Sequence, residues 1–366
     1  MKGLVTFIIA ALTTLISVAQ ENVQTDGGQV TTLADGGQEK TQTAEARQSK
    51  RMAVVETSTC YMRIAPDYES ALETQELMGT VVEIVGESGY WREIVSPQPY
   101  KAWTTEKTLV EMSAEQIREY EAAPKYMFTE LYGHVYAEPS EKAQTICDLV
   151  GGDVMRVALR SAVTKGKWAQ VELPSGTQGW VLKNAVKPLG EMTNIRMGDT
   201  SDQLVSDEKM EAIIASAYQL LGVPYFWGGM SSKGVDCSGL VRICAIMNDV
   251  LLPRNASQMI KCGATVEMSY DTKFWEDSIR TTEGGIFTTE FTQEMKARVK
   301  DLKRGDLVFF GTPATAEKPR RVTHVGIYLG GNRIIHSSHK VRINSLIPGD
   351  ADYYENSHRL IGAVRL

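Results

Sequence analysis

The chain has few cysteines, few histidines and a net negative charge, and these features narrow the class of protein. Its 366 residues include five cysteines and five histidines, and an odd number of cysteines leaves at least one thiol unpaired. No Cys-x-x-Cys pair is present, which argues against a structural zinc site. The formal net charge of −6 gives no reason to expect nucleic acid or an anionic membrane as a partner.

Long apolar runs are also absent beyond the N-terminus. A lysine precedes an apolar run over 4–16, and small residues at 17–19 complete the pattern of a signal peptide over 1–19. That run is short for a membrane span, and no later segment approaches the required length. We therefore expect an exported protein, periplasmic or extracellular, without stable membrane insertion. Residues 20–52 are rich in Gln, Thr, Gly and Glu and predict a flexible tether.

An internal repeat follows the tether. It is marked by two tryptophan pairs, Trp91 with Trp103 and Trp168 with Trp180, each 12 residues apart and offset by 77. Short alternating segments separated by Gly-rich turns favour small all-β barrels, with the tryptophans packed in their cores. Both copies resemble bacterial SH3-like domains. The predicted ranges are 53–112 for barrel one, with 61–66 as its opening strand, 113–125 for a helical connector, and 126–190 for barrel two, with 135–139 as its opening strand.

The apolar pattern then changes to one typical of an α+β domain over 205–366. Apolar residues at helical spacing from Met210 to Leu221 predict one helix, and a second is expected from Cys237 to Asn248. Helices followed by antiparallel strands form a common α+β layout. The strands are predicted over 306–310, 322–329 and 333–336.

Cys237 is placed at the start of its helix. Unpaired backbone N–H groups and the positive end of the helix dipole favour thiolate over thiol at such a position, which suits a nucleophile. A lone cysteine is more often a small buried hydrophobe, so the helix alone does not decide the role. The other cysteines are interpreted as structural: Cys60, Cys147, Cys244 and Cys262.

Two histidines on neighbouring strands decide in favour of catalysis. A three-residue loop over 330–332 would pair Leu329 with Arg333 and set His336 opposite Gly326, so that His324 lies diagonally on the same face. A thiol nucleophile needs a base that a third polar group holds in the right tautomer. Cys237, His324 and His336 supply such a set, and a zinc site built from them would lack a fourth ligand.

With these residues in place, the C-terminal domain resembles the NlpC-type family of papain-like cysteine peptidases of the bacterial cell wall. The resemblance implies Cys237 as nucleophile, His324 as base, His336 as orienting residue, and Tyr225 as an oxyanion donor beside the backbone N–H of the nucleophile. Packing alone is the plainer interpretation of Tyr225. No cofactor and no metal are implied. The matching segments are 224–229 (PYFWGG), 236–241 (DCSGLV), 304–310 (RGDLVFF), 324–328 (HVGIY) and 335–337 (IHS).

Two barrels before such a domain resemble the γ-D-glutamyl-L-diamino acid endopeptidases. There, a carboxylate of the first barrel and the Asp and Ser beside the nucleophile hold the free N-terminal amine of the peptide. The resemblance carries this role to Glu73, Asp236 and Ser238, with Tyr100 as a further contact and Ser257 and Gln258 as additions. Glu73 as a solvated charge and Asp236 as a helix cap remain open alternatives. The segment 264–300 is longer than the resemblance requires and is a candidate lid or cleft wall.

The sequence thus predicts an α+β papain-like peptidase domain preceded by two SH3-like barrels. The expected reaction is hydrolysis of the γ-D-glutamyl–diamino acid bond, with diaminopimelate or Lys, in murein peptides that carry a free N-terminal L-Ala. Two alternatives stay open: a wall-remodelling hydrolase that acts on intact peptidoglycan, and a non-catalytic wall-binding protein.

Overall fold

The computed structural model describes residues 50–97, 100–158, 166–268 and 289–366. The predicted signal peptide and most of the predicted tether lie outside these residues. None of the helices found within them is long and apolar enough to cross a membrane.

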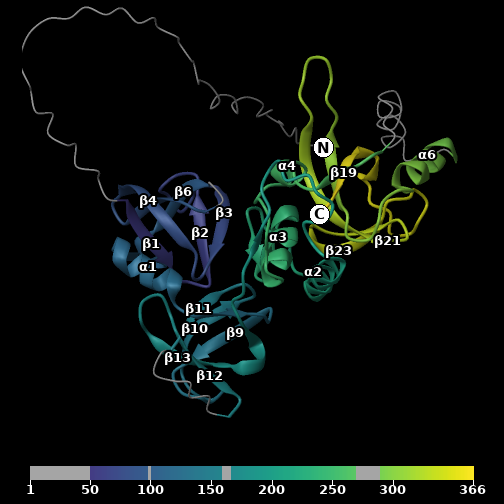
Figure 1. Ribbon diagram of the computed structural model, residues 1–366. Coiled ribbons are helices and arrows are strands. Elements are labelled where there is room, and N and C mark those ends of the chain that lie inside the picture. The colour runs from purple at the N-terminus through teal and green to yellow at the C-terminus, as the bar shows by residue number, and fades with distance from the viewer. Residues whose placement is uncertain (1–49, 98–99, 159–165, 269–288) are drawn as a thin grey trace, which may run out of the picture. The chain divides into compact units, whose positions relative to one another are not determined.

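The N-terminal part consists of two antiparallel β-sheets with the same strand order (Figure 1). The first runs β3-β2-β6-β5-β4-β1-β7 and the second β10-β9-β13-β12-β11-β8-β14, so that every strand of one has its counterpart seven strands later. This equivalence confirms two all-β units, while their SH3-like assignment stays a prediction. The strands of barrel one are β1 (Arg51–Val55), β2 (Thr59–Arg63), β3 (Leu72–Leu77), β4 (Val81–Ser88), β5 (Trp91–Val95), β6 (Lys101–Thr105) and β7 (Leu109–Met112). Those of barrel two are β8 (Lys125–Phe128), β9 (Tyr132–Tyr136), β10 (Thr145–Val150), β11 (Val154–Val157), β12 (Trp168–Glu172), β13 (Gln178–Leu182) and β14 (Val186–Pro188).

The first strand of each barrel is not predicted by the sequence pattern. Strands β1 and β8 precede the predicted opening strands and pair with the last strands, β7 and β14. Within the tryptophan pairs, Trp91 and Trp168 are buried, whereas Trp103 and Trp180 are half-buried. Helix α1 (Ala114–Ala122) joins the barrels and begins at a capping box made by Ser113 and Gln116.

The C-terminal domain packs helices against a six-stranded sheet of order β19-β24-β20-β21-β22-β23. Helix α3 (Cys237–Met247) is buried along its whole length and contacts both α2 (Asp207–Gln219) and β21 (Arg321–Gly330). The strands after the helices agree with the predicted α+β layout. The other strands of this sheet are β19 (Ala264–Val266), β20 (Leu307–Thr312), β22 (Arg333–Ser338), β23 (Lys340–Ser345) and β24 (Leu360–Arg365). Shorter elements are β15 (Thr193–Asn194), β16 (Met230–Ser231), β17 (Gly234–Val235), β18 (Val250–Leu251), α4 (Ala256–Met259) and α6 (Thr289–Val299).

At its two ends, the segment 264–300 belongs to regular elements of the peptidase domain. Its first residues form the edge strand β19, which pairs with β24, and its last residues form helix α6. Residues 269–288 lie outside the described part of the chain.

The hairpin of β21 and β22 corrects one detail of the prediction. Gly330, and not Leu329, pairs with Arg333, so the loop has two residues and a β-bulge precedes it. Gly330, Gly331 and Asn332 all have positive φ, as a tight turn of this kind requires. The bulge restores the register that the longer loop was expected to give.

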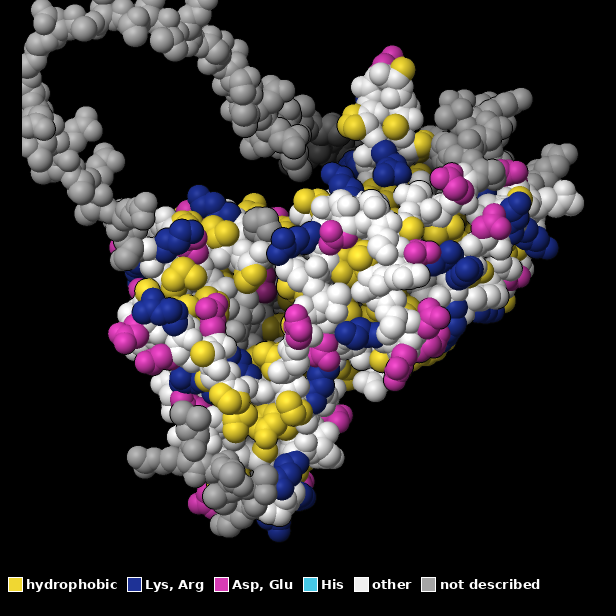
Figure 2. Space-filling model, in the orientation of Figure 1, with side chains coloured by type: hydrophobic (Ala, Val, Ile, Leu, Met, Phe, Trp, Pro, Cys, Tyr) yellow, Lys and Arg dark blue, Asp and Glu magenta, His cyan; other side chains and the backbone are white. Residues whose placement is uncertain are grey.

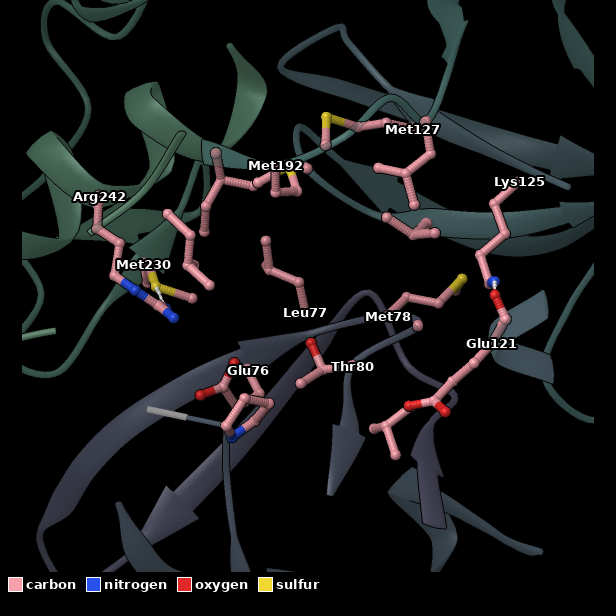
Figure 3. A pocket seen from close by; sticks show the side chains of 18 of the residues that line it. Glu76, Leu77, Met78, Thr80, Glu121, Lys125, Met127, Met192, Met230 and Arg242 are labelled. Atoms are coloured by element: carbon pink, nitrogen blue, oxygen red, sulfur yellow. Dashed lines mark hydrogen bonds between the residues drawn. The ribbon is translucent and has the colours of Figure 1, made fainter. Parts of the chain in front are cut away.

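Both barrels and the peptidase domain line a mostly apolar cavity of about 380 Å³. Figure 3 shows its methionine side chains, with Glu76 and Arg242 together toward one end and Lys125 and Glu121 toward the other. Cys237 is not among its lining residues.

Candidate active site

Cys237 begins helix α3, where the structure holds its sulfur in a buried position. Its N-cap is Asp236, which accepts a hydrogen bond from the backbone N–H of Gly239 at 2.6 Å. The Sγ atom accepts hydrogen bonds from the backbone N–H groups of Val325 and Ser238, and these bonds lower the thiol pKa because they favour the thiolate. Burial outweighs them and raises the pKa of the thiol to about 11, and the neighbouring Asp236 adds to this rise. The expectation of a lowered thiol pKa is therefore wrong for the free protein.

The two histidines face each other, as the strand register predicts. The Nε2 atom of His324 lies 2.7 Å from the Nδ1 atom of His336. The close approach of the two strands explains why glycine suits position 326, since a Cβ on Gly326 would lie 3.1 Å from the Cβ of His336. Because Nε2 of His324 is engaged, Nδ1 is the ring nitrogen left for the thiol, whose sulfur sits against the next residue, Val325.

Asn344 extends the line of histidines and fixes their protons. Its Oδ1 atom lies 2.9 Å from Nε2 of His336, and its Nδ2 atom donates to the backbone carbonyl of Asp352 at 2.7 Å. With the amide nitrogen committed to a carbonyl, the oxygen must face His336, so Nε2 of His336 carries the proton. Nδ1 of His336 is then an acceptor for Nε2–H of His324. The remaining Nδ1 atom of His324 is left unprotonated, which is the state that a general base requires.

Burial keeps both imidazoles neutral. It lowers the pKa of His324 to about 3, and the neighbouring His336 lowers it further. The pKa of His336 is lowered to about 4, again mainly by burial, although its hydrogen bond with Asn344 acts in the opposite direction. Tyr354 packs on the pair, with its ring centroid 4.6 Å from that of His336 and 5.7 Å from that of His324.

A buried ion pair joins the start of α3 to barrel one. Arg254 donates to both carboxylate oxygens of Asp236, at 3.1 and 2.6 Å, and its Nε atom donates to Thr74 on β3 at 2.8 Å. Ser238 donates to Asp236 and accepts from Arg254. The backbone N–H of Gly228 also donates to Asp236 at 3.1 Å. A carboxylate offers about four lone-pair positions, so the protein itself saturates Asp236.

The sulfur opens onto a cleft of about 380 Å³, which we call the nucleophile cleft. Glu73, from barrel one, lines it, and its side chain has no ion pair among the described residues. Tyr225 and the exposed Trp227 line the same cleft. Burial raises the pKa of Tyr225 to about 12, so its hydroxyl keeps its proton at neutral pH and is available as a donor. The other lining residues are Asp236, Cys237, Ser238, Arg254, Asn255, Ala256, Ser257, Arg321, Val322 and Thr323.

Two predicted binding residues lie beside this cleft and not on it. Burial raises the pKa of Tyr100 to about 12, and its hydroxyl has no hydrogen-bond partner among the described residues. Its charged neighbours are Glu73, Asp236, Arg242 and Arg254. The side chain of Gln258 accepts from the backbone N–H of Asn255 and so caps helix α4.

Three residues of the site are not predicted from the sequence: Arg254, Asn344 and Tyr354. The charge of Arg254, close to the segments that carry the resemblance, is a signal that could have identified it. Asn344 has no such local signal. Within the described ranges, no three His, Cys, Asp or Glu side chains are grouped so as to hold a metal ion.

Comparison with known proteins identifies the family of the C-terminal domain. Residues 222–358 match the NlpC/P60 family. A γ-D-glutamyl-L-lysine dipeptidyl-peptidase of Bacillus cereus is 27% identical over 76% of this chain and 70% of its own length. Dipeptidyl-peptidase 6 of Lysinibacillus sphaericus is 23% identical over 80% of this chain and 91% of its own. A crystal structure of an NlpC/P60 family protein from Bacillus cereus has a TM-score of 0.60 and 20% identity, and the match covers 86% of this chain and 99% of that one.

Proposed function

We propose that this chain, which carries an NlpC/P60 domain of the cysteine peptidase type, hydrolyses the γ-D-glutamyl–diamino acid bond of murein peptides with a free N-terminal L-Ala. Three of its curated relatives are named as dipeptidyl-peptidases, and two of the names specify γ-D-glutamyl-L-lysine. We further propose that the protein is exported, with the two barrels over 53–112 and 126–190 and the peptidase domain over 205–366.

The chemistry follows from the histidine line. Nδ1 of His324 accepts the thiol proton as Cys237 attacks the γ-carbonyl, and His336 and Asn344 stabilise the imidazolium that forms. The backbone N–H of Cys237 and the hydroxyl of Tyr225 are the donors that we assign to the oxyanion, and one such donor is worth roughly 3 kcal/mol in related acyl transfers. His324 then gives the proton to the leaving amine, and water hydrolyses the acyl-enzyme.

The presence of Glu73 in the nucleophile cleft carries the substrate assignment. Asp236, the other acid of the cleft, already receives five donors from the protein. An ammonium group moving out of water needs a carboxylate partner, so Glu73 is the acid that remains for the free N-terminus. We assign Ser238, Ser257 and Tyr100 to the proposed binding site as well, with Gln258 supporting Ser257 through helix α4.

The proposal is tested with L-Ala-γ-D-Glu-diaminopimelate and its N-acetylated form. A lost charge-assisted hydrogen bond is worth about 1.5–3 kcal/mol, so we expect acetylation to lower kcat/KM roughly 10- to 150-fold. Glu73→Gln should lower kcat/KM for the free-amine peptide and leave the acetylated one unchanged. Glu69→Gln, an exposed acid of the same barrel outside the cleft, is the matched control.

Intact sacculi provide the third substrate. Their cleavage at an efficiency comparable to that of the free peptide would favour the wall-remodelling hydrolase. Retention on sacculi without turnover of any peptide would favour the non-catalytic wall-binding protein.

A further inference from the structure

We propose that a basic pocket on the β20–β21 hairpin binds a carboxylate of the departing diamino acid and thereby makes the enzyme prefer diaminopimelate to lysine. This inference rests on the proposed function and specifies the substrate of the same site.

The hairpin projects from the peptidase domain, and dark blue basic side chains gather near its base (Figures 1 and 2). A pocket of about 710 Å³ lies against it, which we call the hairpin pocket. Its cationic lining residues are Lys318, Arg320 and Arg321, and its lining contains no acidic side chain among the residues that the structure describes.

The hairpin pocket adjoins the nucleophile cleft. Ser257, Arg321 and Val322 line both, whereas Glu73 and Trp227 line the nucleophile cleft alone. A peptide with its amine at Glu73 and its γ-carbonyl at the thiol therefore continues toward the residues that the two spaces share. The diamino acid is the part of the substrate that lies beyond the cleaved bond.

The cations of the hairpin pocket differ from several arginines of this domain in how they are paired. Within the described part of the chain, Lys318, Arg320 and Arg321 form no ion pair. By contrast, other exposed or half-exposed arginines are neutralised by neighbouring acids: Arg304 by Glu211, Arg333 by Asp352 and Arg365 by Asp306. Three uncompensated positive charges around one pocket, in a chain of net charge −6, indicate an anionic ligand.

Diaminopimelate fits this charge and lysine does not. The two diamino acids differ by one carboxylate at the far end of the side chain. An arginine guanidinium binds a carboxylate through two parallel hydrogen bonds, and the side chain of a lysine residue in the substrate offers no acceptor for them. Since Arg320 and Arg321 are exposed, solvent screens the interaction, and we expect a preference of roughly two- to fivefold.

The test compares kcat/KM for four peptides of the form L-Ala-γ-D-Glu-X. In one, X is diaminopimelate; in another, lysine; in a third, diaminopimelate amidated at its distal carboxylate. The fourth carries diaminopimelate with the α-carboxylate of the γ-D-Glu residue amidated. We expect roughly a two- to fivefold advantage for diaminopimelate, lost on distal amidation and in the Lys318→Gln/Arg320→Gln double variant, whose two residues line the hairpin pocket but not the nucleophile cleft. The lysine peptide should react equally with wild type and variant, and Arg304→Gln should behave as wild type.

Varying the salt concentration distinguishes a preference due to charge from one due to shape. The advantage should shrink toward unity between 0.05 and 0.5 M NaCl, because exposed charges are screened over this range. An advantage that survives salt or the double variant would overturn the inference, as would equal rates for diaminopimelate and lysine. The inference would also be overturned if amidation of the γ-D-Glu α-carboxylate lowered the wild-type rate to that of the double variant. The pocket would then bind that carboxylate and not the one on diaminopimelate. In each case hydrolysis of the lysine peptide shows that the proposed function stands, whereas no hydrolysis of any peptide refutes both.

Discussion

Replacement of Asn344 by leucine tests the proton arrangement of the histidine line. In the native site, Oδ1 of Asn344 accepts the proton on Nε2 of His336 at 2.9 Å, and both side chains are buried. Leucine offers no acceptor, so this proton would be buried without a partner. The proton then moves to Nδ1 of His336, and His324 must in turn carry its own proton on the nitrogen that faces the thiol. In that state it cannot act as a base.

The size of the effect follows from the cost of an unsatisfied buried donor. That cost is about 1–3 kcal/mol, and every 1.4 kcal/mol changes a population tenfold. The fraction of enzyme with a basic Nδ1 on His324 should therefore fall roughly 5- to 150-fold in Asn344→Leu. We expect kcat to fall by this factor with KM nearly unchanged, because Asn344 does not line the nucleophile cleft.

The assay is steady-state hydrolysis of L-Ala-γ-D-Glu-diaminopimelate, combined with thermal unfolding to establish that the variant is folded. Asn248→Leu is the matched control, since the amide of Asn248 is also hydrogen-bonded and partly buried in the same domain but lies on the far end of α3. A folded Asn344→Leu variant with kcat within twofold of wild type would refute the reasoning.

Three further predictions concern the charges of the site. With the thiol pKa near 11 and that of His324 near 3, the rate of alkylation of Cys237 by iodoacetamide should rise about tenfold per pH unit from pH 8 to 10. A rate that is constant between pH 5 and 8 would instead indicate a thiolate–imidazolium ion pair of Cys237 and His324. The folded pKa values of His324 and His336 lie below the unfolded value of 6.5, so their contribution to stability is complete above pH 6.5 and is lost as the pH falls toward 3. In urea unfolding, the free energy of unfolding of His336→Gln should therefore decline less steeply with falling pH than that of the wild type. An equal decline in the two proteins would contradict this. Arg254→Met should lower the free energy of unfolding by about 3–5 kcal/mol, because it leaves the carboxylate of Asp236 buried without its partner, and a loss below 1 kcal/mol in denaturant titration would speak against a buried ion pair.

Local patterns predict the elements that carry the nucleophile and the base. The start of α3 is readable from an apolar stripe and a preceding turn, and the shared face of His324 and His336 follows from period-two alternation along β21 and β22. The predicted loop between these strands is one residue too long. The conclusion about the histidines is nevertheless confirmed, because the bulge at Leu329 adds the residue that the shorter turn removes.

Contacts between distant segments explain what the sequence could not reveal. Strand β1 forms its pairs with β4 and β7, and neither partner adjoins it in the chain. Asn344 reaches His336 from the neighbouring strand β23, although register pairs His336 with Arg342. The thiol pKa depends on burial by the whole domain, which a helix start by itself does not predict. At Cys237, that burial outweighs the favourable backbone N–H groups.

Asp236 shows how such contacts decide between two interpretations of one residue. From the sequence, this acid is either the cap of α3 or a ligand of the substrate amine. The structure shows the cap, and Arg254 from another segment occupies both oxygens as well. An incoming ammonium would have to displace one of these donors within a buried network, at a cost that an unpaired acid does not impose. Glu73, which is exposed and lies at the same cleft, imposes none, and it therefore remains the acid that we propose for the free N-terminus.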